Sequence, residues 1–292
     1  MMEDGLNILE VKDLSTTYKN SGFSISDLSF FIPKGCIVGL IGENGSGKTT
    51  IINSLLGLKK IDSGKIQYWG KSFDINDIDL KNRIGVCFDE IYLPKNLKIS
   101  QVERIYRDMY KDWDKDYFYE TLKKFNISPT KKISDCSKGM QKMFTIVLAI
   151  AANPEFLILD EPTSGLDPVK RKDILNIFQE FVLKESRSIL FSSHITTDIE
   201  QIADIVMYIR EGEIEFIEPI TKLLYEYALV RCSEANFKLI NQEKILAYQK
   251  RPHGYDILIS TRDDKILSNS NLVIDYPNLE DIMSIYSKGV IV

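Results

Sequence analysis

A glycine-rich loop between a buried strand and a helix constrains the fold of this chain more than any other feature. The apolar run from Cys36 to Ile41 is typical of a fully buried strand. Gly42 to Thr49 then reads GENGSGKT, which fits GxxxxGK[ST], and Thr50 to Leu56 follows as an expected helix. Because the glycines let successive N–H groups turn inward at a helix N-terminus, this arrangement predicts a phosphate-binding loop.

The chemistry of the loop residues defines the predicted ligand. Lys48 supplies a point cation for the β- and γ-phosphates of a nucleotide, and Thr49 offers its hydroxyl to Mg²⁺. The alternative is a glycine-rich surface turn with an exposed lysine. We therefore expect a nucleotide with β- and γ-phosphates and Mg²⁺ as ligands, with nucleotide contacts from Asn44, Gly45, Ser46, Gly47, Lys48, Thr49 and Thr50.

Two further strand ends carry polar residues. The apolar run Phe156–Leu159 leads into Asp160 and Glu161, so a buried strand delivers two acids at its carboxyl end, where α/β sheets bind ligands. We predict that Asp160 holds Mg²⁺ and that Glu161 polarises the attacking water. His194 follows the apolar strand predicted at Ser188–Ser192 and is expected to contact the γ-phosphate and that water, although a lone histidine is often structural.

Composition excludes several classes of protein. The 292 residues include 37 Lys+Arg and 42 Asp+Glu, a net charge of -5, which argues against a nucleic-acid binder held by bulk charge. No apolar run reaches the roughly 18–20 residues that cross a bilayer, and the N-terminus lacks a signal-peptide pattern. The four cysteines lack metal-type spacing and are expected as reduced thiols, and two histidines exclude a multi-histidine site. We expect a cytosolic protein.

The pattern of elements divides the chain into unequal parts. Strands alternate with helices around the motifs, which predicts an α/β fold with a parallel sheet. Residues 90–140 are helical in pattern, opening with a capping box at Ser100–Glu103. Two helices are predicted in this segment. The apolar face of the first consists of Val102, Ile105, Tyr106, Met109 and Tyr110, and that of the second consists of Phe118, Leu122 and Phe125. A further helix is predicted at Met140–Ala152.

The chain after residue 217 reads as a small α+β appendage. Ile220–Tyr227 is a possible linking helix, and Leu279–Tyr286 is the last predicted helix. Between them, Ile245–Gln249 and Asp256–Ser260 flank a hairpin turn. The sequence therefore predicts a domain at 1–217, with a helical subdomain at about 90–140, and a second domain at 218–292. Dimer contact and regulation are both open as roles for this tail.

These residues resemble an ABC-type ATPase, the nucleotide-binding subunit of an ABC transporter, over about residues 6–217. Ser164–Asp167 matches the D-loop of that family, and His194 matches its switch histidine. Tyr18 stands where the family places an aromatic ring that stacks on adenine; the alternative is a loop tyrosine with another role. The resemblance implies a P-loop ABC ATPase core with an N-terminal antiparallel β-subdomain and an inserted helical subdomain.

The signature position of the family is occupied by Cys136–Met140. Here Ser137 and Gly139 match the family pattern, whereas Cys136, Lys138 and Met140 depart from it. In the family this motif closes over the ATP held by the other subunit. The resemblance thus implies that Ser137, Lys138 and Gly139 act in trans, in a homodimer or heterodimer with two ATP molecules between its halves.

The Q-loop position is a second departure, because Asp89 replaces the family's glutamine. A carboxylate is able to ligand Mg²⁺, and Glu90 would take that place after a one-residue shift. The family's helical subdomain docks on a membrane partner, for which the aromatic residues of this segment are contacts unless they pack internally: Tyr92, Tyr106, Tyr110 and Trp113.

The tail and the SKGM-type signature are similar to the ATPase subunits of bacterial exporters of the bacitracin, lantibiotic or phenol-soluble-modulin type. This implies an ATP-hydrolysing subunit that powers export, of peptides or antimicrobial compounds, through a separate polytopic membrane permease at the cytoplasmic face of the membrane. No nucleic-acid partner is expected. Two alternatives stay open: an ABC ATPase that acts on DNA or ribosomes, and an ATP-sensing regulator in which Asp89 abolishes turnover.

Overall fold

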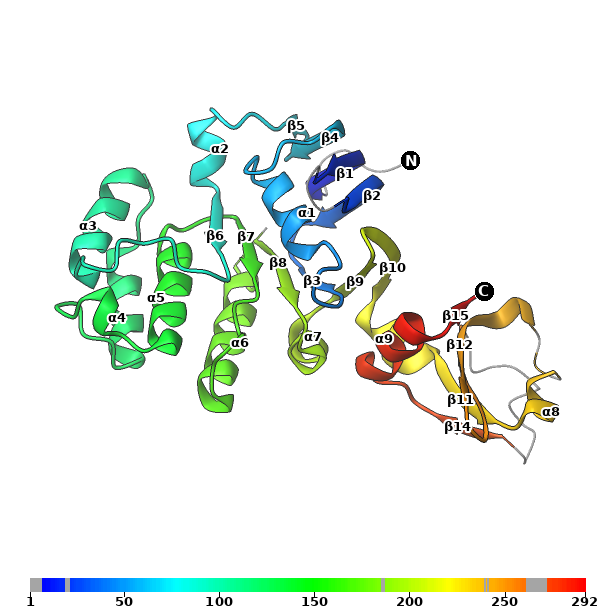
Figure 1. Cartoon of the computed structure of the whole chain (residues 1–292). Helices are drawn as coiled ribbons and strands as arrows, with labels where there is room; N and C mark the ends of the chain where they lie inside the picture. Colours follow the sequence, from blue (N-terminus) through cyan, green and yellow to red (C-terminus); the bar gives the residue numbers. More distant parts are fainter. Residues whose placement is uncertain (1–6, 19–21, 185–186, 239, 241, 261–271) are drawn as a thin grey trace.

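The chain folds around three β-sheets (Figure 1). This computed structural model describes residues 7–18, 22–184, 187–238, 240, 242–260 and 272–292. Within those residues a four-stranded sheet and a six-stranded sheet pack together through the N-terminal part of the chain, and a five-stranded sheet forms near the C-terminus. All four cysteines are unpaired thiols.

The four-stranded sheet is antiparallel, in the order β2-β1-β4-β5. Apolar and polar residues alternate in β2, so that one face is buried and the other is exposed. The bounds are β1 Asn7–Thr17, β2 Ser24–Pro33, β4 Ser63–Tyr68 and β5 Lys71–Ser72. The predicted N-terminal antiparallel sheet is confirmed.

The six-stranded sheet has the order β10-β9-β3-β8-β7-β6, and all its adjacent pairs are parallel except β9 with β10. Every residue of β3, β7 and β8 is buried, which explains the apolar run that each strand contains. The strands are β3 Ile37–Ile41, β6 Ile84–Cys87, β7 Phe156–Asp160, β8 Ser188–Ser193, β9 Ile205–Arg210 and β10 Glu213–Pro219. The associated helices are α1 Lys48–Leu55, α2 Ile78–Asn82, α6 Pro168–Val182 and α7 Thr196–Ile202.

The helical segment between β6 and β7 lies to one side of the parallel sheet (Figure 1). Its helices are α3 Ile99–Met109, α4 Lys115–Lys124 and α5 Lys138–Ala151, with a short 3₁₀ turn at Ile133–Asp135. The predicted face on α4 is confirmed, because Phe118 and Leu122 are fully buried and Phe125 nearly so. Phe118 packs against Phe144 of α5, with ring centroids 6.3 Å apart.

Two details of α3 differ from the prediction. The helix begins one residue before the expected capping box, and Gln101 Oε1 accepts from the Lys98 N–H at 2.8 Å. Glu103 is instead buried, and its Oε2 accepts a hydrogen bond from the Tyr119 hydroxyl at 3.3 Å. The predicted apolar face is also too wide, because Ile105 and Met109 are 47% and 64% exposed. The buried face of α3 runs instead through Ile99, Val102 and Glu103.

Helix α5 begins two residues earlier than the prediction of a helix from Met140. The Ser137 side chain accepts a hydrogen bond from the Met140 N–H at 3.2 Å, which caps the helix. The predicted helix end at Ala152 holds within one residue, because α5 ends at Ala151. The signature segment therefore forms the first turn of a helix.

The five-stranded sheet has the order β14-β11-β13-β12-β15, and its adjacent pairs are antiparallel. The predicted hairpin is present as β12 with β13. The elements are β11 Ala228–Cys232, α8 Glu234–Phe237, a 3₁₀ turn at Gln242–Lys244, β12 Ile245–Arg251, β13 Gly254–Ile259, β14 Val273–Asp275, α9 Leu279–Lys288 and β15 Val290–Ile291. The linking helix predicted at Ile220–Tyr227 is confirmed as a short helical segment: β10 ends at Pro219, helical structure begins at Ile220, and Lys222–Glu226 is π-helical.

Helix α9 connects the C-terminal sheet to the parallel sheet (Figure 1). The Leu279 N–H donates to Glu200 Oε1 of α7 at 2.6 Å, and Arg210 Nη1 donates to the Tyr286 carbonyl at 3.1 Å. At the end of α9 the Ser287 hydroxyl donates to the carboxylate of Glu43, within the glycine-rich loop. None of the helices in the described ranges combines the length and apolarity needed to cross a membrane.

Candidate functional site

Four parallel strands end around one cavity of about 620 Å³. Strand β3 leads into the glycine-rich loop, β7 into Glu161, β8 into His194 and β6 into Asp89. Parallel strands end at the same edge of a sheet, so residues far apart in sequence meet there. The lining consists of Tyr18, Phe23, Asn44, Gly45, Gly47, Lys48, Thr49, Thr50, Asp89, Glu161, Ser164 and His194.

The loop from Gly42 to Thr49 has the geometry of an anion site. Gly45 and Gly47 adopt φ of 84° and 117°, a left-handed region that favours glycine. Gly47 is the N-cap of α1, and no side chain caps the helix. The first N–H groups of α1 are therefore left for a ligand, together with the positive end of the helix dipole.

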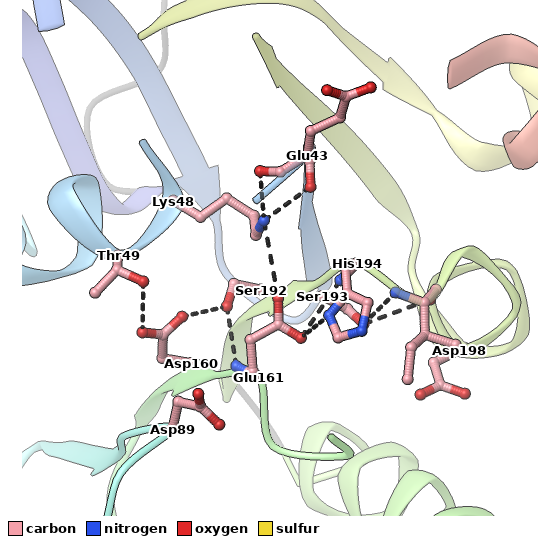
Figure 2. Close-up of polar contacts among 12 residues, drawn as sticks. Glu43, Lys48, Thr49, Asp89, Asp160, Glu161, Ser192, Ser193, His194 and Asp198 are labelled. Atoms are coloured by element: carbon pink, nitrogen blue, oxygen red, sulfur yellow. Dashed lines mark hydrogen bonds and ion pairs between the residues drawn. The ribbon is translucent and has the colours of Figure 1, made fainter. Parts of the chain in front are cut away.

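Lys48 lies buried at the base of the cavity (Figure 2). Its ammonium donates to the carbonyl oxygens of Gly42 at 2.8 Å and Glu43 at 3.1 Å, and it lies 3.8 Å from Glu161 Oε1. Burial lowers the pKa of Lys48 below its ordinary value, and the carboxylates of Glu161 and Asp160 act in the opposite direction. The cation is thus held on the loop where phosphate oxygens would bind.

Asp160, Thr49 and Ser192 form a connected set of oxygen atoms. The Thr49 hydroxyl donates to Asp160 Oδ2 at 3.0 Å, and the Ser192 hydroxyl donates to Asp160 Oδ1 at 2.6 Å (Figure 2). Mg²⁺ prefers such hard oxygen ligands and needs few of them, because water and substrate phosphates complete its shell. Thr49 and Asp160 therefore fit a Mg²⁺ ion bound together with a phosphorylated ligand.

Glu161 and His194 both line the cavity, and their side chains contact each other directly. His194 Nδ1 lies 2.7 Å from Glu161 Oε2, and the His194 N–H donates to the same oxygen at 3.4 Å. Glu161 has φ of 48°, and its N–H donates to the Ser192 hydroxyl at 3.0 Å. Such a strained backbone is typical of positions where a side chain must be aimed. The arrangement presents a carboxylate, oriented by an imidazole, to the cavity.

Tyr18 lies at the mouth of the same cavity, as the adenine-stacking prediction requires. Its ring centroid is 4.0 Å from the ammonium of Lys59 and 6.5 Å from the ring of Phe23. The ammonium covers one face of the Tyr18 ring, so a planar base would stack on the other face. Whether Tyr18 stacks on adenine stays a prediction.

Asp89 lines the cavity, but its carboxylate has a protein partner. Its Oδ1 lies 3.1 Å from the ammonium of Lys142. Glu90, the predicted alternative, does not line the first cavity and instead borders two neighbouring cavities. The structure therefore places Asp89 rather than Glu90 beside the predicted phosphate site.

The signature residues and Asp167 of the D-loop lie outside the first cavity, whereas Ser164 of the D-loop lines it. Ser137 and Lys138 are exposed, and Lys138 lines a second cavity of about 580 Å³ together with Ser164 and Gly165. Asp167 caps α6 by accepting from the Lys170 N–H at 3.0 Å. That hydrogen bond, together with the Lys170 side chain, lowers the pKa of Asp167 below its ordinary value. These residues are available to a second molecule.

Sequence reasoning missed two site residues, Phe23 and Ser192, and named Ser164 only as part of the D-loop. Phe23 and Ser164 line the cavity, and Ser192 holds both Asp160 and Glu161. Ser192 had a signal, because alternate residues of β8 face opposite sides and Ser192 lies two positions before His194. Conversely, Ser46 was predicted as a nucleotide contact, but its buried hydroxyl does not line the cavity.

Comparison with known proteins decides the family. The ABC transporter family model matches residues 25–164. The bacitracin transport ATP-binding protein BcrA of Bacillus licheniformis is 32% identical over 260 residues, covering 86% of this chain and 82% of the relative. The chain belongs to the ABC transporter ATP-binding proteins. Another relative is the lantibiotic transport ATP-binding protein SrtF of Streptococcus pyogenes, 32% identical over 209 residues and covering 71% of this chain and 89% of the relative.

Solved structures agree with this assignment. The ATP-binding subunit of an ABC transporter superimposes with a TM-score of 0.67 at 26% identity, covering 74% of this chain and 91% of that one. A dimeric ATP-binding cassette bound to ADP and Pi gives 0.65 at 23% identity, covering 73% and 98%. The predicted α/β fold of an ABC ATP-binding subunit is therefore confirmed, and phosphate binding by the glycine-rich loop stays a prediction.

Proposed function

We propose that this ABC ATP-binding subunit hydrolyses Mg-ATP and that two copies of the chain drive export through a separate membrane subunit. The observation that carries hydrolysis is the position of Glu161. Its carboxylate lines the cavity, lies 3.8 Å from the Lys48 ammonium and 2.7 Å from His194 Nδ1. A carboxylate held between a phosphate-binding cation and an imidazole is suited to take a proton from water.

The roles of the other residues follow from their contacts. Lys48 and the free N–H groups of α1 bind the β- and γ-phosphates, and Tyr18 stacks on the base. Thr49 and Asp160 hold Mg²⁺, which when bound neutralises developing charge on the phosphates. Glu161 orients and deprotonates the attacking water, and His194 holds Glu161 and contacts the γ-phosphate.

Assembly of two copies completes each site. Ser137, Lys138 and Gly139 lie at the start of α5, outside the cavity of their own chain, and Asp167 is exposed. A helix start offers N–H groups to an anion, so this turn would bind the γ-phosphate held by the partner. A relative of this fold forms such a dimer with ADP and Pi. We propose a homodimer.

The membrane partner would dock beside the helical segment. Tyr92 is 75% exposed there and lines a cavity with Leu58 and Phe88. Tyr106 and Trp113 pack largely against neighbouring rings, so they support this surface from within. The bacitracin and lantibiotic relatives favour export of peptides or antimicrobial compounds, at the cytoplasmic face of the membrane. The division into residues 1–217, with a helical subdomain at about 90–140, and 218–292 is part of this proposal.

The test replaces the proposed base. Glu161→Gln should keep ATP binding while lowering phosphate release by roughly 10²–10⁴-fold, the usual effect of losing a general base. Phosphate release by the purified chain, alone and with its membrane partner, measures turnover, and calorimetry measures ATP binding. The matched control is Glu180→Gln, a change at an exposed carboxylate of α6. Near-normal turnover of Glu161→Gln would remove Glu161 from the mechanism.

The same variant tests assembly. Because Glu161→Gln traps bound ATP, it should form a dimer in Mg-ATP that gel filtration resolves from the nucleotide-free form. Ser137→Ala in the Glu161→Gln background should weaken that dimer, since the proposed contact lies in trans. A Glu161→Gln chain that stays monomeric at saturating ATP would refute the homodimer.

A further inference from the structure

One buried lysine joins helix α5 to the end of strand β6. Lys142 Nζ donates to the carbonyl oxygens of Phe88 at 3.2 Å and Asp89 at 2.9 Å, and lies 3.1 Å from Asp89 Oδ1. The Lys142 side chain is 7% exposed, whereas that of Asp89 is 56% exposed. A buried ammonium with three oxygen partners is held firmly in place, because moving away from those partners would leave a buried charge uncompensated.

The contact between Lys142 and Asp89 joins residues that line two different cavities. Asp89 lines the nucleotide cavity, and Lys142 lines the second cavity with Lys138 and Ser164. Lys142 also lies on the same helix whose first turn carries Ser137 and Gly139. A displacement of α5 is therefore transmitted to Asp89 through three hydrogen bonds of one side chain.

We infer that Lys142 is a positioning residue, which holds Asp89 and the end of β6 at the mouth of the cavity so that the signature turn and the cavity move together. The carboxylate of Asp89 acts through this ion pair and not as a Mg²⁺ ligand. The effect on turnover rests on the proposed hydrolysis. The effect on the structure of the 86–91 segment does not.

The first experiment measures hydrogen exchange in the full chain without nucleotide. Lys142→Met should speed exchange of the amides of residues 86–91 at least about tenfold, because their local opening loses its buried partner. Exchange of the loop residues 42–48 should be unchanged. The matched control, Lys123→Met, alters an exposed lysine of α4 and should leave both segments as they are. Unchanged exchange of residues 86–91 in Lys142→Met would overturn the inference.

The second experiment measures phosphate release. Lys142→Met should lower kcat about tenfold while KM for Mg-ATP stays within about threefold, and Lys142→Arg should restore at least half of kcat. Asp89→Asn should have a smaller effect, because the two carbonyl contacts remain. The double variant should equal Lys142→Met alone, since both changes remove the same contact. Additive losses, or a loss that Arg does not rescue, would contradict the positioning role.

Dependence on Mg²⁺ separates Asp89 from a metal ligand. In Asp89→Asn the Mg²⁺ concentration for half-maximal turnover should stay within about twofold of wild type, and a rise of tenfold or more would overturn the inference. A failure of the proposed hydrolysis gives a different result from a failure of the positioning role. A wild-type chain that releases no phosphate refutes hydrolysis alone, and the exchange measurement then still decides whether Lys142 holds the segment.

Discussion

The imidazole of His194 holds the carboxylate of Glu161 at 2.7 Å, between the ends of two adjacent parallel strands. His194→Ala should therefore leave Glu161 present but misoriented. We expect kcat for ATP hydrolysis to fall about 10²-fold or more, with KM changed little. His253→Ala, at an exposed histidine of the β12–β13 turn, is the matched control. Turnover of His194→Ala within threefold of wild type would contradict this role.

Lys48 contributes to binding rather than to the chemical step alone. Lys48→Ala removes a charge-assisted contact to phosphate, which is worth about 2–3 kcal/mol, so ATP affinity should fall roughly 30- to 150-fold. Calorimetry with Mg-ATP measures the loss, and Lys65→Ala, at an exposed lysine of β4, controls for net charge. An unchanged dissociation constant would show that the loop does not bind phosphate through Lys48.

Ser287 links the tail to the phosphate-binding loop through the carboxylate of Glu43. Because the Glu43 carbonyl also accepts from Lys48, loosening Glu43 should weaken the loop. Ser287→Ala should lower ATP affinity about two- to fivefold, the size of one modest hydrogen bond. Ser284→Ala, on the same helix, serves for comparison. Equal affinities of the two variants would argue against a tie between the tail and the loop.

Asp198 gives a prediction for the effect of pH. Burial raises the pKa of Asp198 above its ordinary value of 3.8, against the pull of the Thr163 hydroxyl and of Arg171. The folded state then binds more protons than the unfolded state, so this group lowers the free energy of unfolding as pH rises from about 3.8 through the folded pKa. In Asp198→Asn the free energy of unfolding does not fall with pH through this group.

Urea unfolding at several pH values measures the Asp198 effect. The free energy of unfolding of Asp198→Asn, minus that of wild type, should increase with pH across that window and then level off, by about 1.4 kcal/mol for each unit of raised pKa. Asp116→Asn, at an exposed position of α4, should show no such trend. A difference that falls with pH would mean that Arg171 stabilises the charged form more than burial opposes it.

The sequence was sufficient where one short segment contains the whole signal. The loop from Gly42 to Thr49 and the strand before Asp160 are continuous motifs, and the parallel sheet follows from their alternation with helices. The start of α3 was misplaced because its first N–H groups, those of Ile99 and Ser100, donate to the carbonyl oxygens of Lys131 and Pro129, which are distant in the sequence. The contact of Lys142 with Asp89 joins residues 53 positions apart, and no local pattern predicts such a pair.

Strand β6 lies at the edge of the parallel sheet, paired only with β7 among the described strands, whereas β3 is flanked on both sides by parallel neighbours. The glycine-rich loop thus follows a strand with two ladders of hydrogen bonds, whereas the helical segment begins after an edge strand with one ladder and returns to the sheet through β7, which has two. Bending at the edge disturbs a single four-residue ladder. Of the two connections between the helical segment and the sheet, the one at β6 therefore yields more easily than the one at β7, and neither strand is the one that carries the glycine-rich loop.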